Sequence, residues 1–215
     1  MKIAVFGGSG RAGHVIVEEA IARGHQVTAI VRDEAAARRR LAPDVPLLVK
    51  APQDVTTADL AGFDAVVDAL SVPWGSGLGY LHLDFAKHII EILANTPTLA
   101  VFILGSASLK MPGDSQPMFE EFPPEASQAP WYDGANFQYQ EWQFLETVTN
   151  VNWIGVSPSE AFPTGPKTGY VMGTDTLLAD DQGQSQISTG NMAAAILDEL
   201  EHPQHIKQRF TVRDK

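Results

Sequence analysis

The sequence predicts an α/β protein with a doubly wound, mostly parallel sheet and helices on both faces. Three observations lead to this prediction. A short apolar segment, IAVF, leads directly into a glycine cluster, GGSGRAG, at residues 7–13. Apolar segments of strand length then alternate with helix-like patterns along most of the chain. The length of 215 residues suits one sizeable α/β domain, so we expect a single domain over residues 1–215.

The first half of the chain shows this alternation clearly. Residues 3–6 are apolar on both faces, as a buried parallel strand requires, and apolar side chains then recur at helical spacing until Gly24. Strands are expected next at 26–31, 46–49 and 64–70, with a short helix at 34–42.

The second half continues the pattern with two interruptions. We expect a helix at 80–94, strands at 99–104, 151–156 and 209–212, and a helix capped by Ser188 or Thr189 before the last strand. The segments 107–145 and 157–187 break the alternation, and the first is rich in proline and bulky aromatic residues. We expect both to be irregular and to form a small substrate-side region, the second of them in the C-terminal part of the chain.

The composition excludes several classes of function. The chain has no cysteine, which excludes disulfides and cysteine nucleophiles, and its six histidines lack metal-ligand spacing, so no metal site is expected. The net charge of −11 disfavours nucleic acid and anionic membranes as partners. No apolar segment approaches the roughly 18 residues of a membrane span. We therefore expect a cytoplasmic protein whose histidines, at positions 14, 25, 82, 88, 202 and 205, are exposed or hydrogen-bonded.

The glycine cluster predicts a dinucleotide-binding turn of the Rossmann type. Its spacing fits both G-x-G-x-x-G and G-x-x-G-x-x-G, and it lies between a buried strand and a helix. Glycine allows the strand to turn sharply, the backbone to approach a pyrophosphate and the helix to pack close to the sheet. The helix N-terminus then offers free N–H groups to the phosphates. The predicted cofactor-binding residues of this loop are Gly7, Gly8, Ser9, Gly10, Arg11, Ala12 and Gly13.

The end of the second strand favours NADP(H) over NAD(H). NAD-binding domains usually place an acidic residue here to hold the ribose hydroxyls, whereas this chain reads Val31-Arg32-Asp33. Arg32, together with Arg11 from the glycine loop, could flank a 2′-phosphate with charge-assisted hydrogen bonds. Asp33 could instead hold ribose hydroxyls, which leaves NAD open.

Two stretches resemble a known family. GGSGRAG with VTAIVRD resembles the atypical short-chain dehydrogenase/reductase-like proteins, which bind NAD(P)H through one Rossmann domain. That group includes biliverdin-IXβ and flavin reductases, NmrA-like proteins and bacterial NADH–flavin reductases. The later stretch NWIGVSPSEAFPTGPKTGY and its continuation to Pro203 resemble the bacterial subgroup. The resemblance implies that Pro52 lies beside the adenine, and that the loops after the fourth and fifth strands run past the nicotinamide ribose, through Leu70, Ser71, Val72, Pro73 and Ser106.

The catalytic residues of the wider superfamily are only partly present. Its reductases usually carry Tyr-x-x-x-Lys and a serine after the fifth strand; here Ser106 fits the serine, but Tyr139 is followed by Gln143 instead of lysine. Ser106 and Tyr139 are therefore the catalytic candidates, without an activated tyrosine. Hydride transfer to a flavin tolerates this loss, because water can supply the remaining proton and the protein mainly aligns two flat rings.

The acceptor is expected beyond the carboxyl ends of the strands. There the glycine loop meets the loops after the fourth, fifth and sixth predicted strands, the last of which contains Pro158. A flat apolar wall could come from Trp74, Met111, Met118, Phe119, Trp131, Tyr132 and Tyr139.

Two functions fit these residues. The first is an NAD(P)H-dependent oxidoreductase that reduces a planar small-molecule acceptor, with flavin as a substrate instead of a tightly bound group. The alternative is a non-catalytic NADP(H) sensor of the NmrA type, which the missing lysine equally allows. A sugar epimerase would need that lysine and a longer C-terminal region. Both a monomer and a homodimer are compatible with the sequence.

Overall fold

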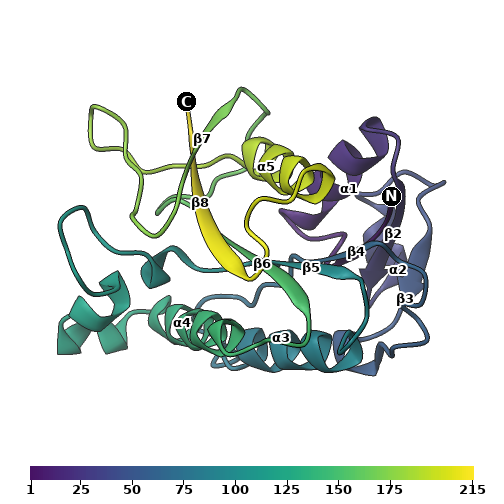
Figure 1. Cartoon of the computed structure of the whole chain (residues 1–215), viewed down its shortest axis with the longest axis horizontal. Helices are drawn as coiled ribbons and strands as arrows, with labels where there is room; N and C mark the ends of the chain where they lie inside the picture. Colours follow the sequence, from purple (N-terminus) through teal and green to yellow (C-terminus); the bar gives the residue numbers. More distant parts are fainter.

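The computed structural model describes all 215 residues and contains one eight-stranded sheet between two layers of helices (Figure 1). The strand order is β3-β2-β1-β4-β5-β6-β8-β7, and every neighbouring pair is parallel except β7 with β8. The strands are β1 (Lys2–Phe6), β2 (Gln26–Val31), β3 (Leu47–Val49), β4 (Ala65–Asp68), β5 (Leu99–Ile103), β6 (Asn152–Ser157), β7 (Tyr170–Gly173) and β8 (Gln208–Asp214). The predicted fold class is confirmed.

The helices cover both faces of the sheet, as Figure 1 shows. Helices α1 (Gly13–Ala22) and α5 (Thr189–Glu201) lie on one face, and α3 (Leu81–Ile92) and α4 (Tyr132–Glu146) lie on the other. The short α2 (Glu34–Arg38) follows β2. Each face has its own apolar cluster, and β1 contributes Ile3 and Val5 to one and Ala4 and Phe6 to the other. This two-sided burial explains why the strands read as continuous apolar segments.

The strand order reverses beside β1, which pairs with β2 on one side and with β4 on the other. The loops that leave β1 and β4 therefore diverge from adjacent strand ends, which is where doubly wound proteins bind ligands. Gly7 has a φ of +67°, and a Cβ there would lie 2.8 Å from the carbonyl oxygen of Ala69 in the β4 loop. Only glycine allows the two loops to approach this closely.

Two expected irregular segments contain regular structure, so these predictions were wrong in part. Helix α4 occupies most of the second half of 107–145, and β7 lies within 157–187. The buried positions of α4 are Tyr139, Glu141 and Leu145, so a carboxyl group interrupts its apolar pattern. Strand β7 is short and pairs on one side only, so it lacks a buried apolar segment.

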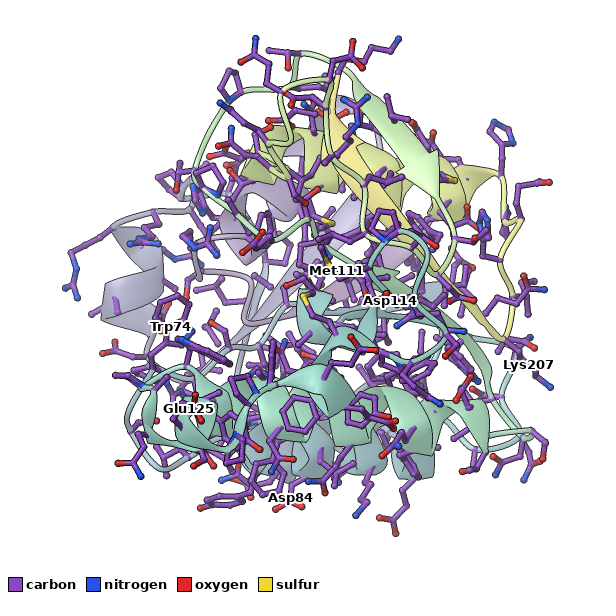
Figure 2. All side chains as sticks on the ribbon, turned by 90° about the vertical axis from the view of Figure 1, so that its left-hand side faces the viewer. Trp74, Asp84, Met111, Asp114, Glu125 and Lys207 are labelled. Atoms are coloured by element: carbon purple, nitrogen blue, oxygen red, sulfur yellow. The ribbon has the colours of Figure 1, made fainter.

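The two substrate-side segments are joined to one another. The N–H of Lys110 donates to the carbonyl of Asp175 (2.8 Å), and the N–H of Leu177 donates to the carbonyl of Lys110 (2.8 Å). The buried Arg209 of β8 donates to Ser108 (2.8 Å) and pairs with Asp175 (2.6 Å). These bonds make one continuous wall along the carboxyl edge of the sheet, the face turned toward the viewer in Figure 2. No helix is both long and apolar enough to cross a bilayer.

Candidate cofactor and acceptor site

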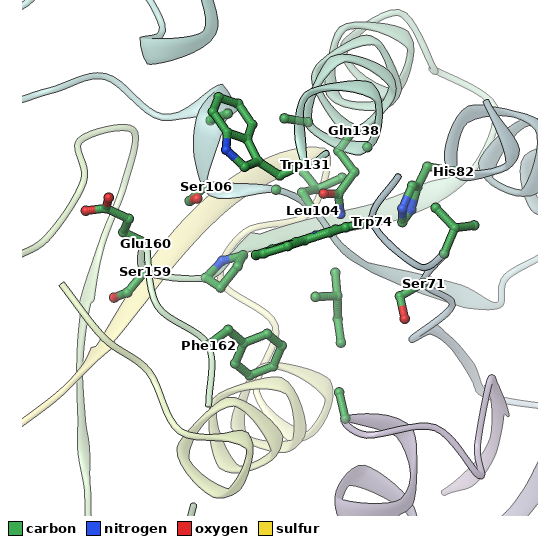
Figure 3. A pocket seen from close by; sticks show the side chains of 18 of the residues that line it. Ser71, Trp74, His82, Leu104, Ser106, Trp131, Gln138, Ser159, Glu160 and Phe162 are labelled. Carbon is green, nitrogen blue, oxygen red and sulfur yellow. The ribbon is translucent and has the colours of Figure 1, made fainter. Parts of the chain in front are cut away.

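A cavity of about 530 Å³ lies at the carboxyl ends of β1, β4, β5 and β6, where the sequence predicts the ligands (Figure 3). Its lining combines the glycine loop, the loop after β4, the turn after β5, the first half of α4 and the segment after β6. The predicted site residues that line it are Arg11, Ala12, Leu70, Ser71, Val72, Ser106 and Pro158. Most of the other lining side chains are apolar or aromatic.

The glycine loop has the geometry of a phosphate-binding turn. The N–H of Gly10 donates to the carbonyl of Gly7 (2.7 Å), which closes the turn. A Cβ on Gly13 would lie only 2.1 Å from that same oxygen, so glycine is required where α1 begins. The N–H groups of Arg11, Ala12 and Gly13 have no acceptor within the protein. Three free amides at a helix N-terminus suit a pyrophosphate, so the residues present fit a dinucleotide.

The two arginines that the sequence placed around one phosphate differ in their contacts. The guanidinium of Arg11 donates to the carbonyl of Phe162 and lies 4.6 Å from the centre of the Phe162 ring. Arg32 is exposed just after β2 and contacts no carboxylate. The pairing of Arg11 with Arg32 around a 2′-phosphate stays a prediction, and it requires Arg11 to leave the carbonyl of Phe162.

The other predicted cofactor residues lie outside the cavity lining. Asp33 is the N-cap of α2, and its carboxylate accepts from the N–H of Ala36 (2.9 Å). Pro52 is buried and begins a short 3₁₀ turn after β3, so it lies beyond β2 from the cavity. Pro73 follows Val72 in the β4 loop, outside the lining. Within the glycine loop, Arg11 and Ala12 line the cavity, whereas the glycines and Ser9 form the turn beside it.

The two catalytic candidates are placed differently. Ser106 lines the cavity, where it begins the 3₁₀ turn that follows β5. Tyr139 does not line it: the side chain is 7% exposed, its hydroxyl donates to Glu120, and its ring stacks on Phe119 at 5.1 Å. Burial and the hydrogen bond to Glu120 raise the pKa of Tyr139 to about 12. We therefore withdraw the role of proton donor at the cavity from Tyr139.

Two polar side chains in the cavity escaped the sequence analysis. Gln138 precedes Tyr139 on α4 and faces the cavity next to Gly105. His82 was expected to be exposed or hydrogen-bonded, but it is buried, lines the cavity and has no side-chain hydrogen bond. Burial lowers the pKa of His82 to about 4, against the opposing charge of Asp133, so its imidazole is neutral. Helical spacing could have shown that His82 and the buried Ala86 share a face of α3.

Aromatic side chains form one wall of the cavity, but they are only in part the residues that the sequence predicts. Trp74, Met118 and Trp131 line the cavity as predicted, and Phe122 joins them by packing edge-on against Trp131 at 5.2 Å. The remaining predicted members, Met111, Phe119, Tyr132 and Tyr139, lie outside the lining. In Figure 3 the Trp74 ring is seen edge-on across the cavity, with Phe162 on one side and Gln138 on the other.

Two buried carboxyl groups lie behind this site. Asp68 ends β4 between Phe6 and Phe102 of the neighbouring strands, and its carboxylate accepts from the N–H of Leu70 (2.9 Å). Burial raises the pKa of Asp68 to about 7. Glu141 of α4 is 2% exposed, and its Oε2 has no hydrogen-bond partner. Burial and the nearby charge of Asp68 raise the pKa of Glu141 well above its usual range.

This fold and glycine loop define a Rossmann-type dinucleotide-binding protein. A family model described as NAD(P)H-binding matches residues 7–203. The chain therefore belongs to the NAD(P)H-binding family, and its cofactor is a nicotinamide dinucleotide.

Similar proteins cover the whole chain. The protein YwnB of Bacillus subtilis is 35% identical over 99% of this chain and 98% of its own length. A crystal structure of a Lactobacillus casei protein is 64% identical, with a TM-score of 0.98 over 100% of this chain and 99% of that one. The crystal structure of a putative NADH-flavin reductase from Streptococcus pneumoniae is 34% identical, with a TM-score of 0.88 over 100% of both chains.

Proposed function

We propose that the protein is an NADPH-dependent reductase that transfers a hydride to a flavin or a related planar acceptor. The observation that carries this proposal is the aromatic-lined cavity directly beside the free amides of the glycine loop. A cavity of about 530 Å³ falls within the range of small-molecule sites. The similar Streptococcus pneumoniae protein, described as a putative NADH-flavin reductase, supports the same class of reaction.

In this proposal the cofactor is held by groups at the end of the sheet. The N–H groups of Arg11, Ala12 and Gly13 bind the pyrophosphate, and Arg32 binds a 2′-phosphate. Asp33 is the competing ribose ligand that would favour NADH, but its carboxylate already caps α2. That engagement supports NADPH as the preferred cofactor.

The chain has little acid–base chemistry to contribute to the reaction. When bound, the nicotinamide would supply a hydride, which brings the acceptor one hydrogen together with two electrons, and water would supply the remaining proton. Within the cavity lining, Ser106 and Gln138 can donate hydrogen bonds to a carbonyl of the acceptor. The aromatic side chains exclude water and hold a flat ring. A cavity without lysine or tyrosine suits such an acceptor better than a simple ketone, which requires a proton donor.

The absence of lysine and tyrosine from the cavity lining also favours a second candidate function, a sensor that binds NADP(H) without catalysing a reaction. A sensor would bind NADPH or NADP⁺ through the glycine loop and have no acceptor. The aromatic wall has no purpose in this alternative, which is why we place the reductase first.

The test is oxidation of NADPH and NADH by the purified protein, followed by loss of cofactor absorbance. The acceptors are riboflavin, FMN, FAD and a set of quinones. The reductase predicts saturable turnover with at least one acceptor and faster oxidation of NADPH than of NADH. Tight NADPH binding without turnover of any acceptor would reject the reductase and support the sensor.

A further inference from the structure

Trp74 combines two properties that rarely occur together in one aromatic side chain. It is 77% exposed, and it also lines the cavity at the end of the sheet. A large apolar ring is stabilised by burial, so leaving one this open is unfavourable unless a ligand covers it. Trp74 is labelled on the left of Figure 2, and in Figure 3 its ring crosses the cavity.

The loop that carries Trp74 is fixed to the opposite wall of the cavity. Gly75 has a φ of +69°, and its N–H donates to the carbonyl of Pro130 (2.7 Å). Trp131 follows directly and is supported on its edge by Phe122. Trp74 and Trp131 are thus carried by two segments that a backbone hydrogen bond joins, and this bond limits how far the segments can move apart before a ligand binds.

The charges around the cavity limit what can lie against Trp74. Arg11 is the only cationic residue of the lining, and its guanidinium is already bound to the carbonyl of Phe162 and lies beside the proposed pyrophosphate site. Glu160 is the one acidic residue in the lining, and His82 is neutral because burial lowers its pKa to about 4. An anionic group on the acceptor ring would therefore lose water and find the one cation of the lining, Arg11, already hydrogen-bonded to a carbonyl beside the proposed pyrophosphate site.

We propose that Trp74 is the outer stacking surface for the acceptor ring, and that the cavity selects planar acceptors whose ring carries no negative charge. This inference rests on the proposed reductase function and deepens it, because it names the acceptor class as uncharged quinones and isoalloxazines. Anionic ring systems are excluded by the shortage of free cations. The expected interaction is offset stacking of the two rings, and its strength depends on the ring area that they share.

The test measures binding instead of turnover. 1,4-Naphthoquinone and its 2-sulfonate are titrated by calorimetry into the protein saturated with NADP⁺, which cannot reduce them. The two probes share one ring system and differ by a single negative charge. The chain has no cysteine, so these quinones cannot alkylate a thiol. The variants are Trp74→Ala, Trp74→Phe and, as a matched control, Leu78→Ala, a 39% exposed apolar residue of the same loop outside the lining.

The proposal predicts that Trp74→Ala raises the Kd for 1,4-naphthoquinone about tenfold, as expected for loss of one stacking surface. Trp74→Phe should raise the Kd less, and Leu78→Ala should leave it unchanged. The sulfonate should bind the unmutated protein at least about tenfold more weakly than the parent quinone. An unchanged Kd in Trp74→Ala, or equal affinity for the two probes, would overturn the proposal.

A parallel measurement separates this proposal from the proposed function. NADP⁺ affinity of Trp74→Ala should equal that of the unmutated protein, because the glycine loop is untouched. Oxidation of NADPH by the unmutated protein with the uncharged quinone tests the reductase alone. Turnover without any effect of Trp74→Ala on quinone binding would reject the role of Trp74 and leave the reductase standing.

Discussion

Arg32 is the single residue on which we expect cofactor choice to depend. Its guanidinium is exposed after β2 and contacts no carboxylate, and Arg11 does not share its position. Charge-assisted hydrogen bonds to a 2′-phosphate are worth about 1.5–3 kcal/mol each, less where solvent screens them. We therefore predict that the protein binds NADPH about ten- to a hundredfold more tightly than NADH. Arg32→Ala should remove most of that preference by weakening NADPH alone, as measured by calorimetry.

The matched control for Arg32 is Arg39→Ala, which removes an exposed arginine just after α2. This variant changes the net charge equally and should leave both affinities unchanged. Equal affinity of the unmutated protein for the two cofactors would contradict the assignment of Arg32. It would move the recognition of the ribose to Asp33.

Tyr139 provides a second prediction for a single residue. Its hydroxyl donates to Glu120, away from the cavity lining, so Tyr139→Phe removes a structural hydrogen bond. We expect a loss of about 1 kcal/mol in the free energy of unfolding and a change in turnover far below the 10²–10⁴-fold typical of losing a general acid. Urea unfolding and steady-state kinetics on the same preparation measure both effects. A loss of turnover of that larger size in a folded variant would return Tyr139 to the catalytic site.

At the scale of elements, two residues of the glycine loop are expected to affect different properties: Gly10 mainly cofactor binding, and Gly13 mainly the stability of the fold. A Cβ on Gly10 would meet only the carbonyl oxygen of Gly7, at 3.0 Å, whereas a Cβ on Gly13 would overlap that atom at 2.1 Å. We predict that Gly10→Ala lowers the Tm only slightly, because the Gly7 carbonyl needs to move little, but binds NADPH at least about tenfold more weakly, since the added methyl group disturbs the loop that the pyrophosphate approaches. Gly13→Ala should instead lower the Tm clearly, since the backbone must move. Unchanged NADPH affinity in Gly10→Ala would contradict the assigned cofactor site.

The elements also show what the sequence could and could not predict. The strands β1, β2, β4, β5 and β6 are buried on both faces, so each appears as an apolar segment that needs no partner to be recognised. The sequence did not predict α4, because its buried face includes Glu141 and a carboxyl group interrupts the apolar pattern. The burial of this carboxyl group depends on the tertiary fold and not on the neighbouring residues. The lining residues Gln138 and His82 were missed for a related reason. Their helices bring them to the cavity, and no local motif marks them.

At the scale of the whole molecule, the free energy of folding must offset the cost of burying two carboxyl groups beneath the site. The chain carries a net charge of −11, yet Asp68 and Glu141 are buried near one another without a cationic partner. In the folded state both carboxyl groups stay protonated up to a higher pH than they do in water. Burial raises the pKa of Asp68 from its usual 3.8 to about 7, so between these values the folded protein binds more protons than the unfolded chain. This group therefore makes the protein less stable as pH rises from about 4 to 7.

His82 has the opposite effect over nearly the same range, and this determines how the last prediction is tested. Burial lowers the pKa of His82 from 6.5 to about 4, so its contribution to stability rises with pH and partly hides that of Asp68. The comparison is therefore between Asp68→Asn and the unmutated protein by urea unfolding at pH 5 and pH 8. Asparagine can still accept from the N–H of Leu70 but does not ionise. Relative to the unmutated protein, Asp68→Asn should gain up to about 2–3 kcal/mol in the free energy of unfolding at the higher pH, since each pKa unit is worth about 1.4 kcal/mol.

The control is Asp84→Asn, which removes an exposed carboxylate of α3 and should show no such gain. A stability difference for Asp68→Asn that is the same at both pH values would mean that this carboxyl titrates as it does in the unfolded chain.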